Sequence, residues 1–234
     1  MKKKMEILMA VILLLTACLF AKEGAVLVAG RKADTKQGGT CIVIDAGHGG
    51  ADPGKVGVNG AEEKVLNLQI ALRLKKLLEA EGIEVVLTRT DDNGLYRENA
   101  SNKKVEDMRR RCEIIAEAMP VFTVSIHQNS YPEEYVKGAQ TFYYGRSAEG
   151  KVLAEYIQAS MVERLDPENH RTAKANESYY LLKRTQSPTV IVECGFLSNS
   201  QEAELMTDAE YQEKAAWAIH MGIQQYLSAE NIMY

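Results

Sequence analysis

Residues 41–50 have the sequence CIVIDAGHGG, in which an unbroken apolar run meets a polar, glycine-rich segment. A short apolar run without alternation predicts a strand that is buried on both faces. The glycines that follow permit backbone turns that other residues resist. The segment therefore predicts a buried strand over residues 41–44, with His48 on a loop just beyond the strand end.

Strand and helix patterns alternate along the rest of the chain. Apolar residues at helical spacing predict helices over residues 62–81, 108–118, 148–165 and 209–227. Runs rich in β-branched residues predict further strands over residues 83–88, 121–126, 140–144 and 189–192. Because strands that alternate with helices form mostly parallel sheets, we expect a single α/β domain with helices on both faces of a central sheet.

The composition limits what such a domain can do. The chain has 234 residues, of which 46% are hydrophobic and 26% are charged, and this is enough for one sizeable core. Its formal net charge is −4 and its pI is near 5.7. A chain with this balance has no broad basic field to bind a polyanion. We therefore expect no nucleic acid partner.

The N-terminus has the features of an export signal. Three lysines at positions 2–4 precede an uncharged, mostly apolar run over residues 7–21, which is shorter than the about 20 residues of a spanning helix. We therefore expect a signal peptide or signal anchor over residues 1–21. The exported protein would be secreted, cell wall-bound or membrane-associated. Cys18 lies in a segment similar to a lipoprotein processing box, so lipidation at this residue is an alternative.

A connector is expected over residues 22–39, the folded domain over residues 40–228 and a C-terminal tail over residues 229–234. The domain contains three cysteines at wide spacings, which are Cys41, Cys112 and Cys194. Their odd number and spacing do not indicate a disulfide framework. We expect them to be small buried side chains.

Polar side chains lie at the predicted carboxyl ends of several strands, where open α/β sheets usually bind ligands. His48 follows one strand, His127 closes another, and Glu193 ends an apolar run. Two histidines and one carboxylate are a common ligand set for a catalytic zinc ion that keeps one position open. Glu63, in the first turn of a predicted helix, can supply the carboxylate, and Glu62 is an alternative.

Each of these residues also has a simpler interpretation. A single histidine at a strand end often hydrogen-bonds a carbonyl group, and the helix dipole favours Glu63 in a first turn. Glu193 is harder to explain in this way, because a carboxylate in an apolar strand costs desolvation energy unless it faces a partner or a polar cleft. The neighbouring Cys194 is expected to point to the opposite face of the sheet.

Four local sequences resemble those of the zinc-dependent N-acetylmuramoyl-L-alanine amidases, and they occur in the order typical of that family. They are residues 44–54 (IDAGHGGADPG), Glu63-Lys64 with Asn67-Leu68, residues 125–129 (SIHQN) and residues 192–199 (VECGFLSN). Arg111 and the pair Lys174-Ala175 are also similar to the family. The resemblance covers residues 40–228.

This resemblance implies a zinc amidase catalytic domain. One zinc ion per chain would be held by His48, Glu63 and His127, and Glu193 would be the catalytic carboxylate. The enzyme would hydrolyse the amide bond between N-acetylmuramic acid and L-alanine, so peptidoglycan is the expected partner. An activating or anchoring protein at the membrane remains a further expectation.

Several features bear on the substrate preference and on which subgroup of these amidases the chain resembles. Gln128 and Cys194 depart from the residues usual in the family, which affects the expected substrate preference more than the reaction. The segment between His127 and Gly138 is too short for the inhibitory helix that some of these amidases carry. A small exported domain without wall-binding repeats resembles the sporulation and germination amidases, which act on spore cortex on the forespore or cortex side and initiate muramic-δ-lactam formation.

Three other functions stay open at this point. One is a general cell-separation wall amidase. Another is a catalytically inactive peptidoglycan-binding regulator, against which the full set of four candidate residues argues. The third is a two-metal phosphatase or nuclease, whose site would need bridging carboxylates in addition to the residues named above.

Overall fold

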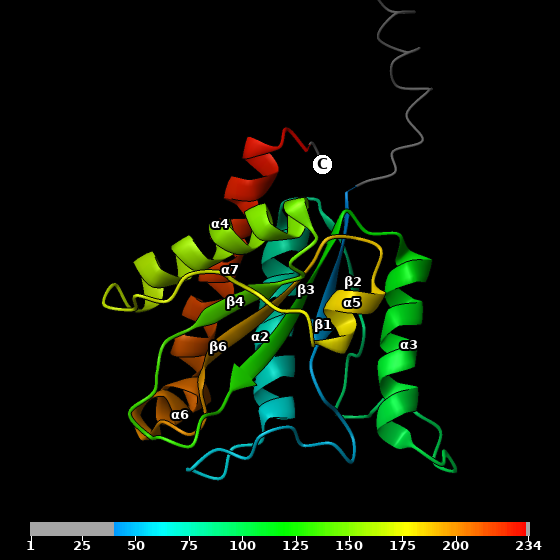
Figure 1. The fold of residues 1–234 in the computed structure, drawn as a ribbon, viewed down its shortest axis with the longest axis horizontal. Coiled ribbons are helices and arrows are strands. Elements are labelled where there is room, and N and C mark those ends of the chain that lie inside the picture. Colours follow the sequence, from blue (N-terminus) through cyan, green and yellow to red (C-terminus); the bar gives the residue numbers. More distant parts are fainter. Residues whose placement is uncertain (1–39, 233–234) are drawn as a thin grey trace, which may run out of the picture. The chain divides into compact units, whose positions relative to one another are not determined.

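A six-stranded sheet forms the centre of the protein in the computed structural model, which describes residues 40–232 (Figure 1). The strands are β1 (Cys41–Ala46), β2 (Glu84–Leu87), β3 (Phe122–Asn129), β4 (Gln140–Tyr143), β5 (Lys174–Ala175) and β6 (Thr189–Phe196). Their order in the sheet is β2-β1-β3-β6-β4-β5. All neighbouring strands are parallel except β4 and β6, which are antiparallel. The prediction of a mostly parallel sheet is confirmed.

Helices cover both faces of this sheet. They are α2 (Glu63–Ala80), α3 (Lys103–Ala118), α4 (Ala148–Leu165), α5 (Tyr180–Arg184), α6 (Ser200–Thr207) and α7 (Ala209–Ala229). In Figure 1, α5 lies in front of the strands, whereas α2 and α7 lie behind them. The described residues therefore form the expected α/β domain.

The apolar run of β1 is unbroken because both of its faces are buried. Ile42 and Ile44 belong to the main core cluster, which also contains the apolar residues of α2, α4 and α7. Val43 points the other way and packs with Ile115 of α3 and Leu181 of α5. Successive side chains of a strand point to opposite faces, so each face receives apolar residues in turn.

Helix α3 begins earlier than predicted. The sequence pattern predicts it from residue 108, whereas α3 begins at Lys103. The side chain of Asn102 caps the helix by accepting a hydrogen bond from the backbone N–H of Val105 at 3.1 Å. The short elements β5, α5 and α6 were not predicted, because they span only 2, 5 and 8 residues and lack a clear periodicity.

Two strands extend beyond their predicted ends. β3 continues to Asn129 and β6 to Phe196, so His127 and Glu193 lie within strands rather than at their last positions. The two residues are partners in the parallel register of β3 and β6, and the register shifts directly after His127. The sheet therefore places the second histidine beside the buried glutamate.

The expectations for residues 1–39 concern a part of the chain outside the described residues. They include the signal segment, the processing box at Cys18 and the connector. Within residues 40–232, none of the helices combines the length and the apolar character that a membrane crossing would require.

Candidate metal centre and active site

The loop after β1 positions the first histidine in an unusual backbone conformation. His48 has a φ of 63°, in the left-handed region that few residues other than glycine adopt. Arg111 holds this conformation by donating a hydrogen bond from Nη2 to the carbonyl oxygen of His48 at 2.5 Å. The ring is oriented by Asp52, whose Oδ2 lies 3.0 Å from Nδ1 of His48. The Nε2 atom is thereby directed toward Glu63.

Glu63 is the first residue of α2 and is buried. Its Oε2 accepts a hydrogen bond from the backbone N–H of Lys55 at 2.8 Å. Its Oε1 accepts bonds from the backbone N–H of Gln128 at 3.0 Å and from Nδ2 of Asn67 at 3.2 Å. The carboxylate is therefore fixed by a loop, a strand and its own helix.

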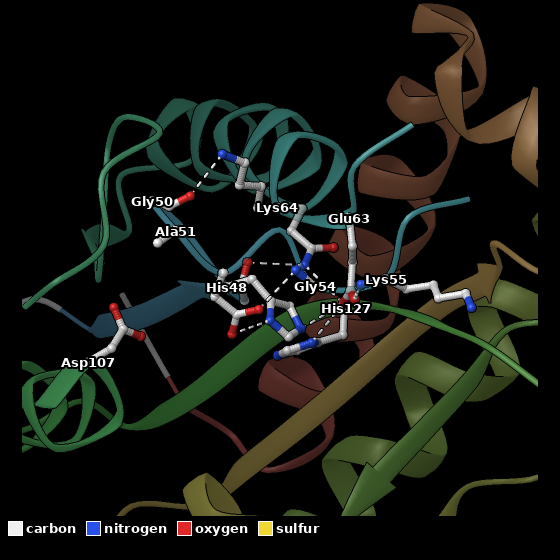
Figure 2. A network of polar contacts seen from close by, with 12 residues as sticks. His48, Gly50, Ala51, Gly54, Lys55, Glu63, Lys64, Asp107 and His127 are labelled. Atoms are coloured by element: carbon white, nitrogen blue, oxygen red, sulfur yellow. Dashed lines mark hydrogen bonds and ion pairs between the residues drawn. The ribbon is translucent and has the colours of Figure 1, made fainter. Parts of the chain in front are cut away.

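The three predicted ligands meet at one point. Nδ1 of His127 lies 3.0 Å from Oε1 of Glu63, and Nε2 of His48 lies 3.2 Å from the same oxygen. One ligand atom from each residue can be chosen so that all three lie within 4.8 Å of one another. Figure 2 shows the three side chains pointing toward a common centre.

A glycine makes room for this arrangement. A Cβ atom at Gly47 would lie 2.3 Å from the ring of His127, a distance that no real side chain tolerates. The carbonyl oxygen of Gly47 accepts hydrogen bonds from Asn67 and Arg89. The glycine of the opening motif is therefore needed so that the loop and β3 can approach each other.

The donor set fits a divalent metal ion. Burial by itself would raise the pKa of Glu63, but hydrogen bonds from His127 and His48 hold it well below its usual range. Burial would lower the pKa of His48, whereas the bonds to Glu63 and Asp52 raise it to about 9. Glu63 is therefore ionised, and its negative charge favours a positive charge on the neighbouring histidines. A metal cation can supply that charge in place of a proton.

A buried ion pair lies beneath the centre. Asp45 is buried, and it accepts hydrogen bonds from Nη1 of Arg111 at 2.5 Å, Oγ of Ser125 at 2.6 Å and Oγ1 of Thr88 at 2.7 Å. Burial opposes ionisation, but Arg111 and the two hydroxyl donors lower the pKa of Asp45 to about 2. Since Arg111 also holds the carbonyl oxygen of His48, the pair links the core of the sheet to the first histidine.

A second buried arginine, Arg89, connects the loop after β1 to α2 by hydrogen bonds. Nε of Arg89 donates to the carbonyl oxygen of Ala46 at 2.9 Å. Its Nη2 donates to the carbonyl oxygens of Gly47 at 3.0 Å and Lys64 at 2.7 Å. The irregular backbone between β1 and α2 is therefore satisfied by arginine side chains rather than by regular secondary structure.

Glu193 lies in the wall of the adjacent cleft. It is 7% exposed, and among the described residues its Oε2 has no hydrogen-bond partner. Burial raises its pKa to about 7, although the nearby His127 acts in the opposite direction. The cleft has a volume of about 430 Å³ and is lined by both histidines, Glu193 and Tyr179. No helix lies between β3 and β4, as expected for a site without an inhibitory insertion.

Comparison with known proteins identifies the family. Residues 42–225 match the family model Amidase_3, described as N-acetylmuramoyl-L-alanine amidase. The chain belongs to this family. Its members are enzymes that hydrolyse the amide bond between N-acetylmuramic acid and L-alanine in peptidoglycan, so the predicted enzyme class is confirmed.

Individual Amidase_3 proteins are similar over most of the chain. The germination-specific N-acetylmuramoyl-L-alanine amidase of Bacillus subtilis is 38% identical over 193 residues, which cover 81% of each protein. LytC of the same species, also an N-acetylmuramoyl-L-alanine amidase, is 34% identical over 80% of this chain and 36% of its own length. The CwlD amidase of Clostridioides difficile, solved in complex with the GerS lipoprotein, is 44% identical with a TM-score of 0.79, and the match covers 81% of this chain and 99% of that one.

The structure places Glu62, the alternative carboxylate, away from the predicted site. It brings together the four residues that the sequence indicates, which are His48, Glu63, His127 and Glu193. Glu62 precedes α2, and its carboxylate contacts Lys64 rather than the histidines. Cys194 packs in the main core on the opposite face from Glu193, as predicted, whereas Cys41 and Cys112 are only partly buried. Sequence reasoning missed Asp52 and Tyr179. Asp52 lies within the motif of residues 44–54 that resembles the amidase family, four residues after a candidate ligand, and this was the signal for it in the sequence.

Proposed function

We propose that this Amidase_3 protein is a zinc-dependent enzyme in which His48, Glu63 and His127 hold one zinc ion and Glu193 is the catalytic carboxylate. The observation that carries the proposal is the convergence of three donor atoms within 4.8 Å, each from a different element. Two imidazoles and one carboxylate leave a fourth position open, as catalytic zinc sites require. The contact of His48 with Asp52 supports it further, because a metal-bound histidine usually donates its second ring N–H to a carboxylate, a backbone carbonyl or water.

The bound zinc would lower the pKa of a water molecule and polarise the amide carbonyl. The protein's own residues would manage the protons. A carboxylate whose pKa is about 7 is divided between its two forms at neutral pH, so Glu193 can accept the proton of the attacking water. It can then return that proton to the leaving nitrogen of L-alanine. Ser125 donates its hydrogen bond to Asp45 and is not part of this chemistry.

We further propose spore cortex peptidoglycan as the substrate and muramic-δ-lactam formation as the process. The similarity to a germination-specific amidase over 81% of both chains supports this assignment. The relative solved with the GerS lipoprotein supports a lipoprotein as activating or anchoring partner. These roles require export, for which we propose a signal over residues 1–21. A linker over residues 22–39 would follow it and precede the catalytic domain of residues 40–228.

Digestion of purified peptidoglycan tests the reaction. Mass spectrometry should detect free stem peptides with L-alanine at the amino terminus, whereas new reducing sugar ends would contradict the proposal. Cortex and vegetative wall digested in parallel separate the spore role from a general wall amidase. Equal or faster cleavage of vegetative wall would favour the general enzyme. The intact mass of the protein from its host tests removal of residues 1–21.

Two variants separate metal binding from chemistry. His127→Ala should lose most of the zinc and the activity, because the site has no spare protein ligand. Glu193→Gln keeps the size of the side chain but not its basicity, so it should retain one zinc per chain and lose about 10²-fold or more in rate. His170→Ala, which removes an exposed histidine, is the control and should keep both. Loss of zinc in Glu193→Gln would make Glu193 a ligand, and full activity would remove it from the mechanism.

A further inference from the structure

Tyr179 is a residue of the catalytic cleft that the mechanism above does not use. It directly precedes α5, and its hydroxyl oxygen lies 3.5 Å from Oε1 of Glu193. Among the described residues no other side chain lies within hydrogen-bond distance of the Glu193 carboxylate, and Oε2 has no partner at all. The two oxygens of the catalytic carboxylate are therefore unequal, because one faces a phenol group and the other is free.

The phenol ring is held from two sides. The backbone N–H of Tyr179 donates to Oδ1 of Asn176 at 2.8 Å, which fixes the turn before α5. The ring packs edge to face against Phe142 of β4, with centroids 5.5 Å apart and planes at 76°. It belongs to the small cluster of Phe142, Leu182 and Ile191 on the cleft side of the sheet. The direction of the hydroxyl is thus set by the scaffold rather than by solvent.

The hydroxyl is also suited to act as a constant donor. Burial and the neighbouring Glu193 raise the pKa of Tyr179 to about 12, so the phenol keeps its proton at every pH at which the enzyme could work. The 3.5 Å separation is long for a hydrogen bond. Catalytic hydrogen bonds are often long in ligand-free structures and shorten when substrate is bound.

We propose that Tyr179 is a positioning residue, whose hydroxyl donates to Oε1 of Glu193 and so directs the free Oε2 toward the attacking water and the leaving nitrogen. The proposal rests on the function proposed above, in which Glu193 moves the proton. A glutamate without this contact would retain several side-chain rotamers, only some of which are productive. Tyr179 itself exchanges no proton with the substrate in this scheme, and no bond to it forms or breaks.

Tyr179→Phe tests the proposal because it removes the hydroxyl and keeps the ring that packs on Phe142. The variant, loaded with zinc and assayed on a soluble muramoyl peptide, should lose about 10- to 100-fold in kcat, the scale of one hydrogen bond to a charged group. Its KM, zinc content and melting temperature should stay unchanged. A metal-free crystal structure of the variant should show Glu193 in more than one rotamer.

Tyr144→Phe is the matched control. Tyr144 packs against the same cluster but does not line the cleft, so loss of its hydroxyl should leave kcat unchanged. If Tyr179→Phe raises KM without lowering kcat, the residue binds substrate and the proposal is wrong. An equal loss in both tyrosine variants would indicate a packing effect and would also contradict it.

A double variant separates positioning from direct action on the substrate. If Tyr179 acts only through Glu193, adding Tyr179→Phe to Glu193→Gln should cause little further loss of rate. A full additional loss would mean that the phenol stabilises the substrate or transition state directly, which would overturn the positioning role. Other results would contradict the proposed function rather than the role of Tyr179. These are that the unmodified protein releases no stem peptide, or that Glu193→Gln is fully active.

Discussion

The buried pair of Arg111 and Asp45 gives the sharpest test of how the fold supports the metal centre. The exposed fractions of the two side chains are only 1% and 2%. Arg111 donates from Nη1 to Asp45 and to the carbonyl oxygen of Ala46, from Nη2 to the carbonyl oxygen of His48, and from Nε to Asp107. Arg111→Met keeps much of the side-chain length but removes all four hydrogen bonds. It leaves Asp45 as a buried carboxylate with only hydroxyl donors.

The expected cost follows from this geometry. Removal of one partner from a buried ion pair costs about 3–5 kcal/mol, because the other charge stays buried without compensation. Folded domains are stable by only about 5–15 kcal/mol, so the free energy of unfolding should fall by about a fifth or more. Zinc affinity should fall as well, since the carbonyl oxygen of His48 loses its donor and the left-handed backbone at this residue loses its support.

Urea unfolding of the metal-free protein, followed by circular dichroism, measures the cost of Arg111→Met. The control is Asp45→Asn combined with Arg111→Met. Because the double variant no longer carries a charge at residue 45, only Asp107 loses a charged partner, and the loss of stability of this variant should be smaller than the sum of the two single losses. A loss below about 1 kcal/mol for Arg111→Met, or strict additivity in the double variant, would refute the reasoning.

Three further predictions concern the end of β1 and the loop that follows it. Asp52→Asn weakens the support of the His48 ring, so zinc affinity should fall about 10- to 100-fold with the fold intact, as metal competition would measure. Gly47→Ala forces a Cβ against the His127 ring and should abolish stoichiometric zinc binding by elemental analysis. Because the pKa of Asp45 is lower in the folded protein, its ionised carboxylate stabilises the fold at pH values above its unfolded pKa. This stabilisation is lost as the pH falls toward about 2. Metal-free Asp45→Asn should therefore lose less stability than the parent protein between about pH 4 and about pH 2, as urea unfolding across this range would measure.

The sequence alone predicted the structural features that depend on residues close together in the chain. The unbroken apolar run of β1 predicted a strand buried on both faces, and the glycines after it predicted a turn. Parallel strands end at a common edge of the sheet, so residues placed at strand ends could be expected to meet. For this reason the sequence pattern indicates His48, His127 and Glu193 as candidates, and the order of the four motifs indicates the family.

Only the tertiary structure could decide which side chains support that site. Arg111 and Asp45 are 66 residues apart, and their contact depends on how α3 packs across β1. Tyr179 reaches Glu193 because the unpredicted helix α5 lies over β6. The choice of Glu63 over Glu62 depends on where α2 begins and how its first turn packs, because Glu62 precedes the helix in an extended conformation and Glu63 is its first residue. Periodicity indicates that a helix exists and which face is apolar, but packing against other elements sets the direction of each polar side chain, and that packing is decided by the whole core.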